Sequence, residues 1–126
     1  MADESGPSVA ITGIGGIFFR SSDPEGLAQW YKQHFGISMV SEGPPWQQDA
    51  GMTVFSPFPS DTDYFGRSDQ QFMLNFRVDD IDAALKSLGD AGVQVDENRM
   101  DEEYGRFAWV YDPEDNKIEL WQPPAM

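Results

Sequence analysis

The sequence predicts an α+β fold built from two tandem βαβββ modules, residues 9–58 and 71–123, which together form one domain at residues 9–123. Each half shows the same order of elements: a strand, a capped helix and three short strands. Equivalent positions lie 57 residues apart, as with Asp23 and Asp80, which both stand at the start of a helix. An order of elements that repeats at a fixed interval is typical of a duplicated module.

The first module begins with a strand at residues 11–21 that is rich in glycine and aromatic residues. A helix follows, with Ser22 or Asp23 as its N-cap, because short polar side chains accept hydrogen bonds from the free N–H groups of a first turn. Gly36 ends this helix, since glycine adopts the left-handed conformation at low cost. Turn signals then separate three short apolar runs, which we expect to be strands at residues 37–40, around Trp46 and at residues 52–55.

The second module repeats this pattern from a strand at residues 72–78. Asp79 or Asp80 caps the next helix, and Gly92 ends it. Apolar residues at helical spacing predict that one face of the helix is buried. The three strands expected after this helix lie at residues 93–95, 106–111 and 117–121.

The loop at residues 57–70 joins the two modules and is long for a connection within one domain. It contains Phe58, Tyr64 and Phe65, so it either folds over the mouth of a pocket or packs its rings against the outside of the sheet. Residues 1–8 are polar, and we expect them to form a disordered tail.

The acidic composition excludes several classes of function. The net charge is −14 at pH 7 and the pI is near 4.1, which argues against nucleic acid and anionic membranes as partners. The absence of cysteine excludes disulfides, zinc–thiolate sites and cysteine nucleophiles. No apolar run reaches membrane-spanning length and no signal-like segment opens the chain, so we expect a cytoplasmic protein.

Three segments carry a resemblance to a known family: GIGGIFFRSSDPEGLAQWY, FMLNFRVDDIDAALKSLGDAG and GRFAWVYDPEDNKIELWQP. Together they resemble the vicinal oxygen chelate superfamily, which includes glyoxalase I, extradiol dioxygenases, and fosfomycin- and bleomycin-resistance proteins. The last segment, a strand, Asp-Pro, a turn and a strand with Ile-Glu-Leu, is the most specific. The resemblance implies a cup-shaped, curved mixed sheet with helices on its convex side, and a homodimer in which both chains help to form each cup.

The same resemblance implies four metal-ligand positions, of which three carry no suitable side chain. The histidine positions are Gly16 and Met73, and the third position is Val54 or Phe55, leaving only Glu119. One carboxylate does not make a divalent-metal site, because catalytic zinc keeps about three protein ligands. The only histidine, His34, lies on a predicted helix away from the cup. We therefore expect neither a metal nor another cofactor.

Alternation along the strands predicts which side chains face the cup. The expected site is aromatic, with polar points and cations near it, as in many small-molecule sites. The predicted ligand-binding residues are Gly16, Phe18, Arg20, Phe55, Met73, Asn75, Arg77, Trp109 and Trp121, with Glu119 as the candidate catalytic residue. Lys117 and Phe107 are expected on the same face. Arg20 and Arg77 either bind an anionic group or pair with acids such as Glu119.

Three functional hypotheses follow. The first is a metal-free protein of the bleomycin-resistance type that binds a small aromatic or anionic molecule in the cup. The second is a metal-independent enzyme, lyase-like or isomerase-like, that uses Glu119 as a general base. The third is a non-catalytic interaction module whose cup is filled by its own side chains.

Overall fold

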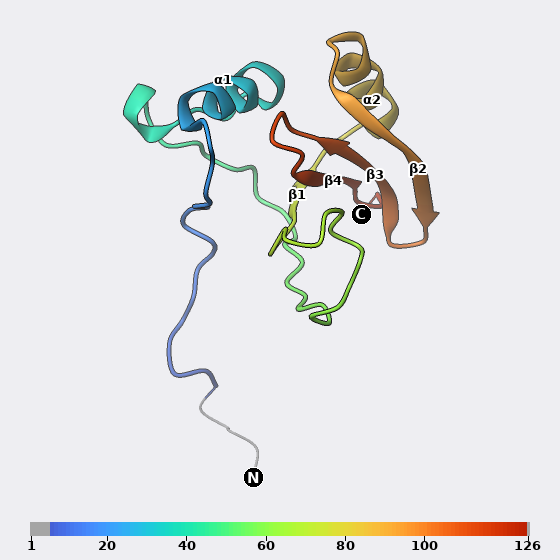
Figure 1. Ribbon diagram of the computed structural model, residues 1–126. Coiled ribbons are helices and arrows are strands. Elements are labelled where there is room, and N and C mark those ends of the chain that lie inside the picture. The colour runs from blue at the N-terminus through green and yellow to red at the C-terminus, as the bar shows by residue number, and fades with distance from the viewer. Residues whose placement is uncertain (1–5, 126) are drawn as a thin grey trace.

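The structure is a computed structural model that describes residues 6–125 (Figure 1). Most of the tail predicted at residues 1–8 therefore lies outside the described residues. The elements, in chain order, are α1 (Pro24–Phe35), the short 3-10 helix η1 (Val40–Glu42), β1 (Leu74–Arg77), α2 (Ile81–Asp90), β2 (Gln94–Glu102), β3 (Gly105–Tyr111) and β4 (Lys117–Gln122). Among the described residues, no helix is long and apolar enough to cross a membrane.

The second module has the predicted βαβββ order, and the α+β class is confirmed. Its four strands form one mixed sheet in the order β1-β4-β3-β2, with β1 parallel to β4 and the other pairs antiparallel. The strand β2 is longer than the predicted segment 93–95, because it continues past an irregularity between Val95 and Arg99 to Glu102.

Both predicted helices are present and capped as expected. The Asp23 side chain accepts a hydrogen bond from the Gly26 N–H at the start of α1, and Asp80 does the same for Ala83 in α2. Gly36 ends α1 with a φ of 72°, the left-handed conformation for which glycine was predicted there.

The main hydrophobic core lies between the two helices and one face of the sheet (Figure 1). Leu27 and Tyr31 of α1 meet Ile81 and Leu88 of α2 over the inward side chains of β3 and β4, among them Val110. Since both helices cover the same face, the opposite face of the sheet carries no helix. We call this second face the open face.

Two carboxylates in the turn between β3 and β4 attach α1 to the second module. The Tyr31 hydroxyl donates a buried hydrogen bond of 2.8 Å to Asp112. Glu114 accepts hydrogen bonds from the Ser21 hydroxyl, at 2.6 Å, and from the backbone N–H groups of residues 22 and 23. These bonds position the start of α1 on the closing hairpin.

The strands predicted in the first module are not formed within the described part of the chain. Residues 11–21, 37–40 and 52–55 contain no strand, and the segment before α1 runs away from the sheet (Figure 1). The side chains of residues 11–20 and 52–55 are exposed: Phe18 is 91% accessible and Phe55 is 89% accessible. A strand needs a neighbouring edge for its N–H and C=O groups. Among residues 6–125, β1 pairs only with β4, so its other edge is unpaired.

We predict that Tyr31→Phe lowers the free energy of unfolding by about 1.5–3 kcal/mol, because it removes a buried hydrogen bond to a carboxylate. Urea denaturation of the parent and the variant measures this difference. Tyr104→Phe is the matched control, since Tyr104 is exposed and its ring packing is kept. Equal stability of Tyr31→Phe and the control would show that the Tyr31–Asp112 contact does not hold α1 in place.

Candidate functional site

An aromatic cluster covers the open face of the sheet. Its buried members are Phe107, Trp109 and Trp121, and Tyr64, Met73 and Met100 pack against them. The rings of Phe107 and Trp121 are stacked, with centroids 6.3 Å apart and an angle of 10° between their planes. Glu119 lies within this cluster and is only 8% exposed. The open face therefore combines aromatic surface with one buried carboxylate.

The strand register explains why three polar groups meet at this point. Asn75 of β1 lies opposite Glu119 of β4, and Trp109 of β3 lies opposite Glu119 on the other side. Directly opposite residues on paired strands point to the same face and lie close enough to interact. The three side chains thus form one row across three strands.

Three neutral donors satisfy the carboxylate of Glu119. The Asn75 amide donates to Oε1 at 2.7 Å, and the Trp109 indole N–H donates to Oε2 at 3.0 Å. The Tyr64 hydroxyl donates a third, short hydrogen bond to Oε2. A buried charge is tolerated only when it is paired or well hydrogen-bonded, and this one is held by hydrogen bonds alone.

Tyr64 comes from the loop that joins the two modules, and it places part of that loop on the open face. Its ring lies edge-on to Trp109, with centroids 6.0 Å apart. Lys117 donates a hydrogen bond to the Tyr64 carbonyl, and its ammonium lies 5.2 Å from the Tyr64 ring and 5.3 Å from the Trp109 ring. Burial, followed by the contact with Glu119, raises the pKa of the Tyr64 hydroxyl, so this group stays protonated and donates.

The role of Tyr64 was not predicted from the sequence. The aromatic residues of the loop indicated that it folds over a surface, but this surface could be either the mouth of a pocket or the outside of the sheet. Periodicity assigns faces only within strands and helices, so it could not place a loop side chain on Glu119. The aromatic content of residues 57–70 was the single available signal.

The structure brings together about half of the predicted site. Met73, Asn75, Trp109, Glu119 and Trp121 meet on the open face. The remaining predicted residues, Gly16, Phe18, Arg20, Phe55 and Arg77, are not members of the cluster.

Neither predicted arginine forms an ion pair with Glu119 among residues 6–125. The Arg77 guanidinium donates to the Asp49 carbonyl at 3.0 Å and lies against Gly51, where a side chain would collide with it. Arg20 is exposed. The hypothesis that Arg20 or Arg77 neutralises Glu119 is therefore not supported by these contacts.

The residues at the four metal-ligand positions do not fit a divalent metal. Within residues 6–125, no three His, Cys, Asp or Glu side chains converge. Gly16 offers no donor atom, and the thioether of Met73 suits soft metals such as copper(I). His34 packs against Trp30 on α1, with ring centroids 5.1 Å apart. Both oxygens of Glu119 already accept hydrogen bonds from neutral groups.

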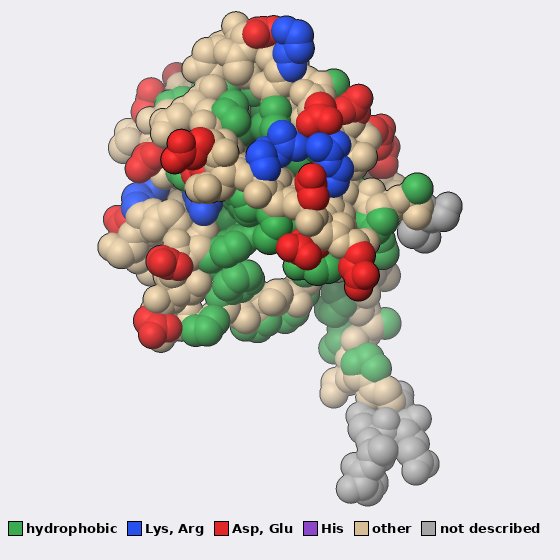
Figure 2. Space-filling view, turned by 90° about the vertical axis from the view of Figure 1, so that its right-hand side faces the viewer, with side chains coloured by type: hydrophobic (Ala, Val, Ile, Leu, Met, Phe, Trp, Pro, Cys, Tyr) green, Lys and Arg blue, Asp and Glu red, His purple; other side chains and the backbone are tan. Residues whose placement is uncertain are grey.

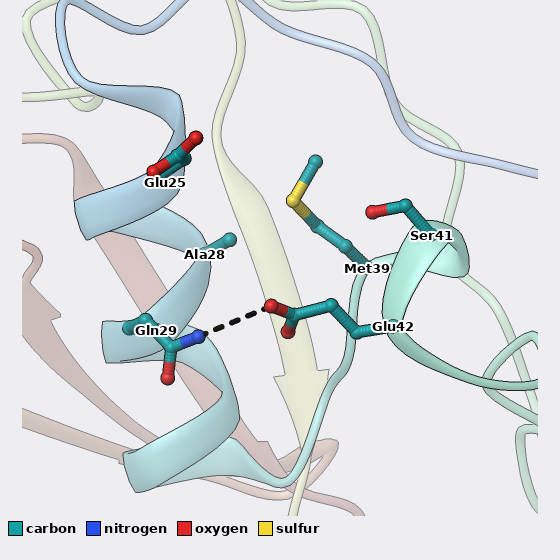
Figure 3. A pocket seen from close by; sticks show the side chains of 6 residues that line it. All are labelled: Glu25, Ala28, Gln29, Met39, Ser41 and Glu42. Atoms are coloured by element: carbon teal, nitrogen blue, oxygen red, sulfur yellow. Dashed lines mark hydrogen bonds between the residues drawn. The ribbon is translucent and has the colours of Figure 1, made fainter.

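A hollow lies away from the aromatic cluster, between α1 and η1 (Figure 3). It measures about 380 Å³, and the Gln29 amide donates to Glu42 across it at 3.3 Å. Its lining residues are Glu25, Ala28, Gln29, Met39, Ser41 and Glu42. Without an aromatic ring or a cation, this acidic hollow has little to hold an organic ligand, so the open face is the better candidate.

The chain belongs to the glyoxalase/bleomycin resistance protein/dioxygenase superfamily, whose family model matches residues 13–120. This confirms the resemblance found in the three sequence segments. No similar protein was found among curated sequences.

The chain is also similar to solved structures. TnmS3, an antibiotic binding protein from Streptomyces sp. CB03234, is 26% identical, with 92% of this chain and 99% of that chain covered and a TM-score of 0.65. A protein of unknown function from Agrobacterium tumefaciens str. C58 is 17% identical, with 88% and 98% covered and a TM-score of 0.50. TioX from Micromonospora sp. ML1 is 17% identical, with 84% and 92% covered and a TM-score of 0.47.

We predict that Glu119→Gln lowers the pKa of Tyr64 toward its ordinary value, because the variant removes the charge that disfavours the phenolate. Ultraviolet absorbance of tyrosinate, followed through an alkaline titration, should rise at lower pH in the variant than in the parent. The same substitution in a Tyr64→Phe background should leave the titration unchanged. Overlapping curves for the parent and Glu119→Gln would contradict the contact between the two side chains.

Proposed function

We propose that this protein binds a small aromatic molecule on the open face of its sheet, without a metal, in the manner of an antibiotic-binding member of the superfamily. The observation that carries the proposal is a buried carboxylate held by neutral donors inside an aromatic cluster. TnmS3, at 26% identity over nearly the whole chain, is an antibiotic binding protein, which supports the same class of ligand here.

The chemistry of the open face favours an aromatic ligand over an anionic one. Ring contacts in proteins contribute about 0.5–1.5 kcal/mol each beyond the area they bury, and Trp109, Trp121 and Phe107 supply such surfaces. An anion, by contrast, would meet the charge of Glu119. The arginines expected to hold an anion lie elsewhere in the single chain.

Exposed surface supports a homodimer in which both chains form each cup. Within the described part of the chain, all but one of the exposed large hydrophobic residues precede β1, the exception being Tyr104. The accessible surface is 9551 Å², whereas a compact monomer of 14.2 kDa exposes roughly 6,800 Å². Figure 2 shows hydrophobic side chains open to solvent on one face of the chain. Obligate dimers bury about 2,000–5,000 Å², so a second copy would account for this excess.

The dimer would also complete the site. The open face is a single wall in one chain, and Phe18 and Phe55 extend into solvent. In our proposal, these rings and Arg20 of one chain cover the aromatic cluster of its partner. The net charge of −14 opposes association, so the dimer should weaken at low ionic strength, where repulsion is least screened.

A general-base role for Glu119 receives less support than binding. A base must accept a proton from the substrate, but Asn75, Trp109 and Tyr64 already donate to this carboxylate. The same arrangement suits a carboxylate that orients a ligand.

A complementation experiment tests both the site and the dimer. We predict that Phe18→Ala and Trp121→Ala each weaken binding of the probe 2-naphthol about tenfold, since each removes a ring from the cup. When the two variant chains are unfolded together and refolded, heterodimers regain one intact cup, so tight binding should reappear at a fraction of the sites. Isothermal titration calorimetry measures both affinity and the fraction of tight sites.

Phe35→Leu is the matched control, because Phe35 of α1 packs against Phe76 on the helix-covered side of the sheet. It should bind the probe as the parent does. If the mixed refolding gives no tight sites, each cup is made by one chain. The proposal that Phe18 of one chain covers the aromatic cluster of its partner is then wrong. If Trp121→Ala binds like the parent, the open face is not the binding site.

A further inference from the structure

The hydroxyl of Tyr64 donates to Glu119 from a loop, so it occupies a position on the open face where a ligand can exchange a hydrogen bond with this carboxylate. We propose that Glu119, Asn75 and Trp109 form a receptor for the hydroxyl group of a phenolic ligand, and that Tyr64 is its internal occupant until the ligand replaces it. This inference rests on the proposed aromatic-binding function and specifies the class of ligand.

The three donors to Glu119 differ in how firmly they are fixed. Asn75 and Trp109 belong to strands that pair directly with β4, so their donors hold the carboxylate at a set position. Tyr64 belongs to a loop, and it is only half buried. A ligand can therefore replace the Tyr64 hydroxyl without breaking the sheet, whereas it cannot replace the other two.

The anchors of the loop lie on the C-terminal side of Tyr64. Arg67 donates to the carbonyls of Glu114 and Asp115 and to the Asn116 side chain. Gln70 bonds to the backbone of Lys117 in both directions, at 3.0 and 2.8 Å. The loop is thus fastened to the closing hairpin beyond Tyr64, while Tyr64 itself is held by Lys117 and Glu119. Its displacement breaks those two hydrogen bonds and the ring contacts of Tyr64 with Trp109 and Phe58, but no bond of the sheet.

The position of the Tyr64 ring indicates what a ligand needs. A ring in that place lies edge-on to Trp109 and close to the Lys117 ammonium, which favours an electron-rich aromatic face. Its polar group must donate a hydrogen bond, because the acceptor is a carboxylate. A phenolic hydroxyl meets both requirements. An ionised carboxylate has no hydrogen to donate and adds a negative charge beside Glu119. An ether oxygen can accept a hydrogen bond but cannot donate one.

Binding of a phenol exchanges one hydrogen bond of Glu119 for another and adds none. When a phenol replaces Tyr64, one charge-assisted hydrogen bond takes the place of another, and Glu119 stays satisfied. When a ligand without a donor replaces Tyr64, the buried carboxylate loses a partner, which carries the full penalty of an unmade hydrogen bond. The receptor therefore discriminates by rejecting ligands that cannot donate, as other buried polar sites do.

Three matched probes test this receptor: 2-naphthol, which donates; 2-methoxynaphthalene, which does not; and 2-naphthoate, which carries a negative charge. We expect the parent protein to bind 2-naphthol most tightly and 2-naphthoate most weakly. Tyr64→Phe removes the internal competitor and should raise the affinity for 2-naphthol about tenfold. Glu119→Gln should reduce the preference for 2-naphthol over 2-methoxynaphthalene, because the amide oxygen still accepts a hydrogen bond but no longer a charge-assisted one.

Tyr111→Phe is the control, because Tyr111 also donates to a carboxylate, that of Asp96 at 2.7 Å, but in a different place. It should leave all three affinities unchanged. Far-ultraviolet circular dichroism and thermal unfolding confirm that each variant is folded before titration. If Glu119→Gln proves unfolded, the Tyr64→Phe result decides, because that substitution keeps the ring.

The outcomes separate the receptor from the broader function. If 2-naphthol and 2-methoxynaphthalene bind equally well to parent and variants, the aromatic site stands and the hydroxyl receptor is overturned. The receptor is also overturned if Tyr64→Phe binds 2-naphthol no more tightly than the parent does. A preference of the parent for 2-naphthoate over 2-naphthol overturns it as well. If none of the probes binds to any folded variant, both the receptor and the proposed aromatic-binding function are overturned.

Discussion

The need to satisfy one buried carboxylate governs the open face of this protein. Glu119 lies among aromatic rings, where an unpaired charge would be very costly, so its oxygens must find donors. The sheet supplies two of them from the adjacent strands, and the connecting loop supplies the third. All three donors are neutral side chains, and the acceptor that they surround sets which polar groups the open face can receive.

This arrangement separates the chain from the metal-dependent enzymes that share its fold. At the two positions where the resemblance implies histidines the chain has Gly16 and Met73, and both oxygens of Glu119 accept hydrogen bonds from neutral side chains. On β1, β3 and β4 the register still brings three polar side chains into one row. A row of side chains that could orient a metal-bound substrate in one protein can, with neutral donors, orient a ligand hydroxyl in another.

The sequence predicted the second module well because its information is local. Alternation along the strands placed Asn75, Trp109, Glu119 and Trp121 on one face, and the structure places them together. Caps and left-handed glycines likewise located both helices. The partner of Glu119 in the loop could not be predicted, because a loop has no period that fixes the direction of a side chain.

The first module shows a different limit. Its apolar runs were interpreted as strands, yet residues 11–21 and 52–55 form none in the described chain. A strand is defined by the edge it pairs with, and a single sequence does not say whether that edge belongs to the same chain. The exposed rings in these segments, such as Phe18 and Phe55, therefore bear directly on assembly.

Native mass spectrometry of freshly purified protein tests the central claim most directly, because it reports subunits, metal and retained ligand in one spectrum. The account predicts a species of two chains, without a stoichiometric metal, whose additional mass, where present, is that of an organic molecule. One divalent metal ion per chain that is lost in Glu119→Gln would contradict it, because Glu119 would then be a metal ligand.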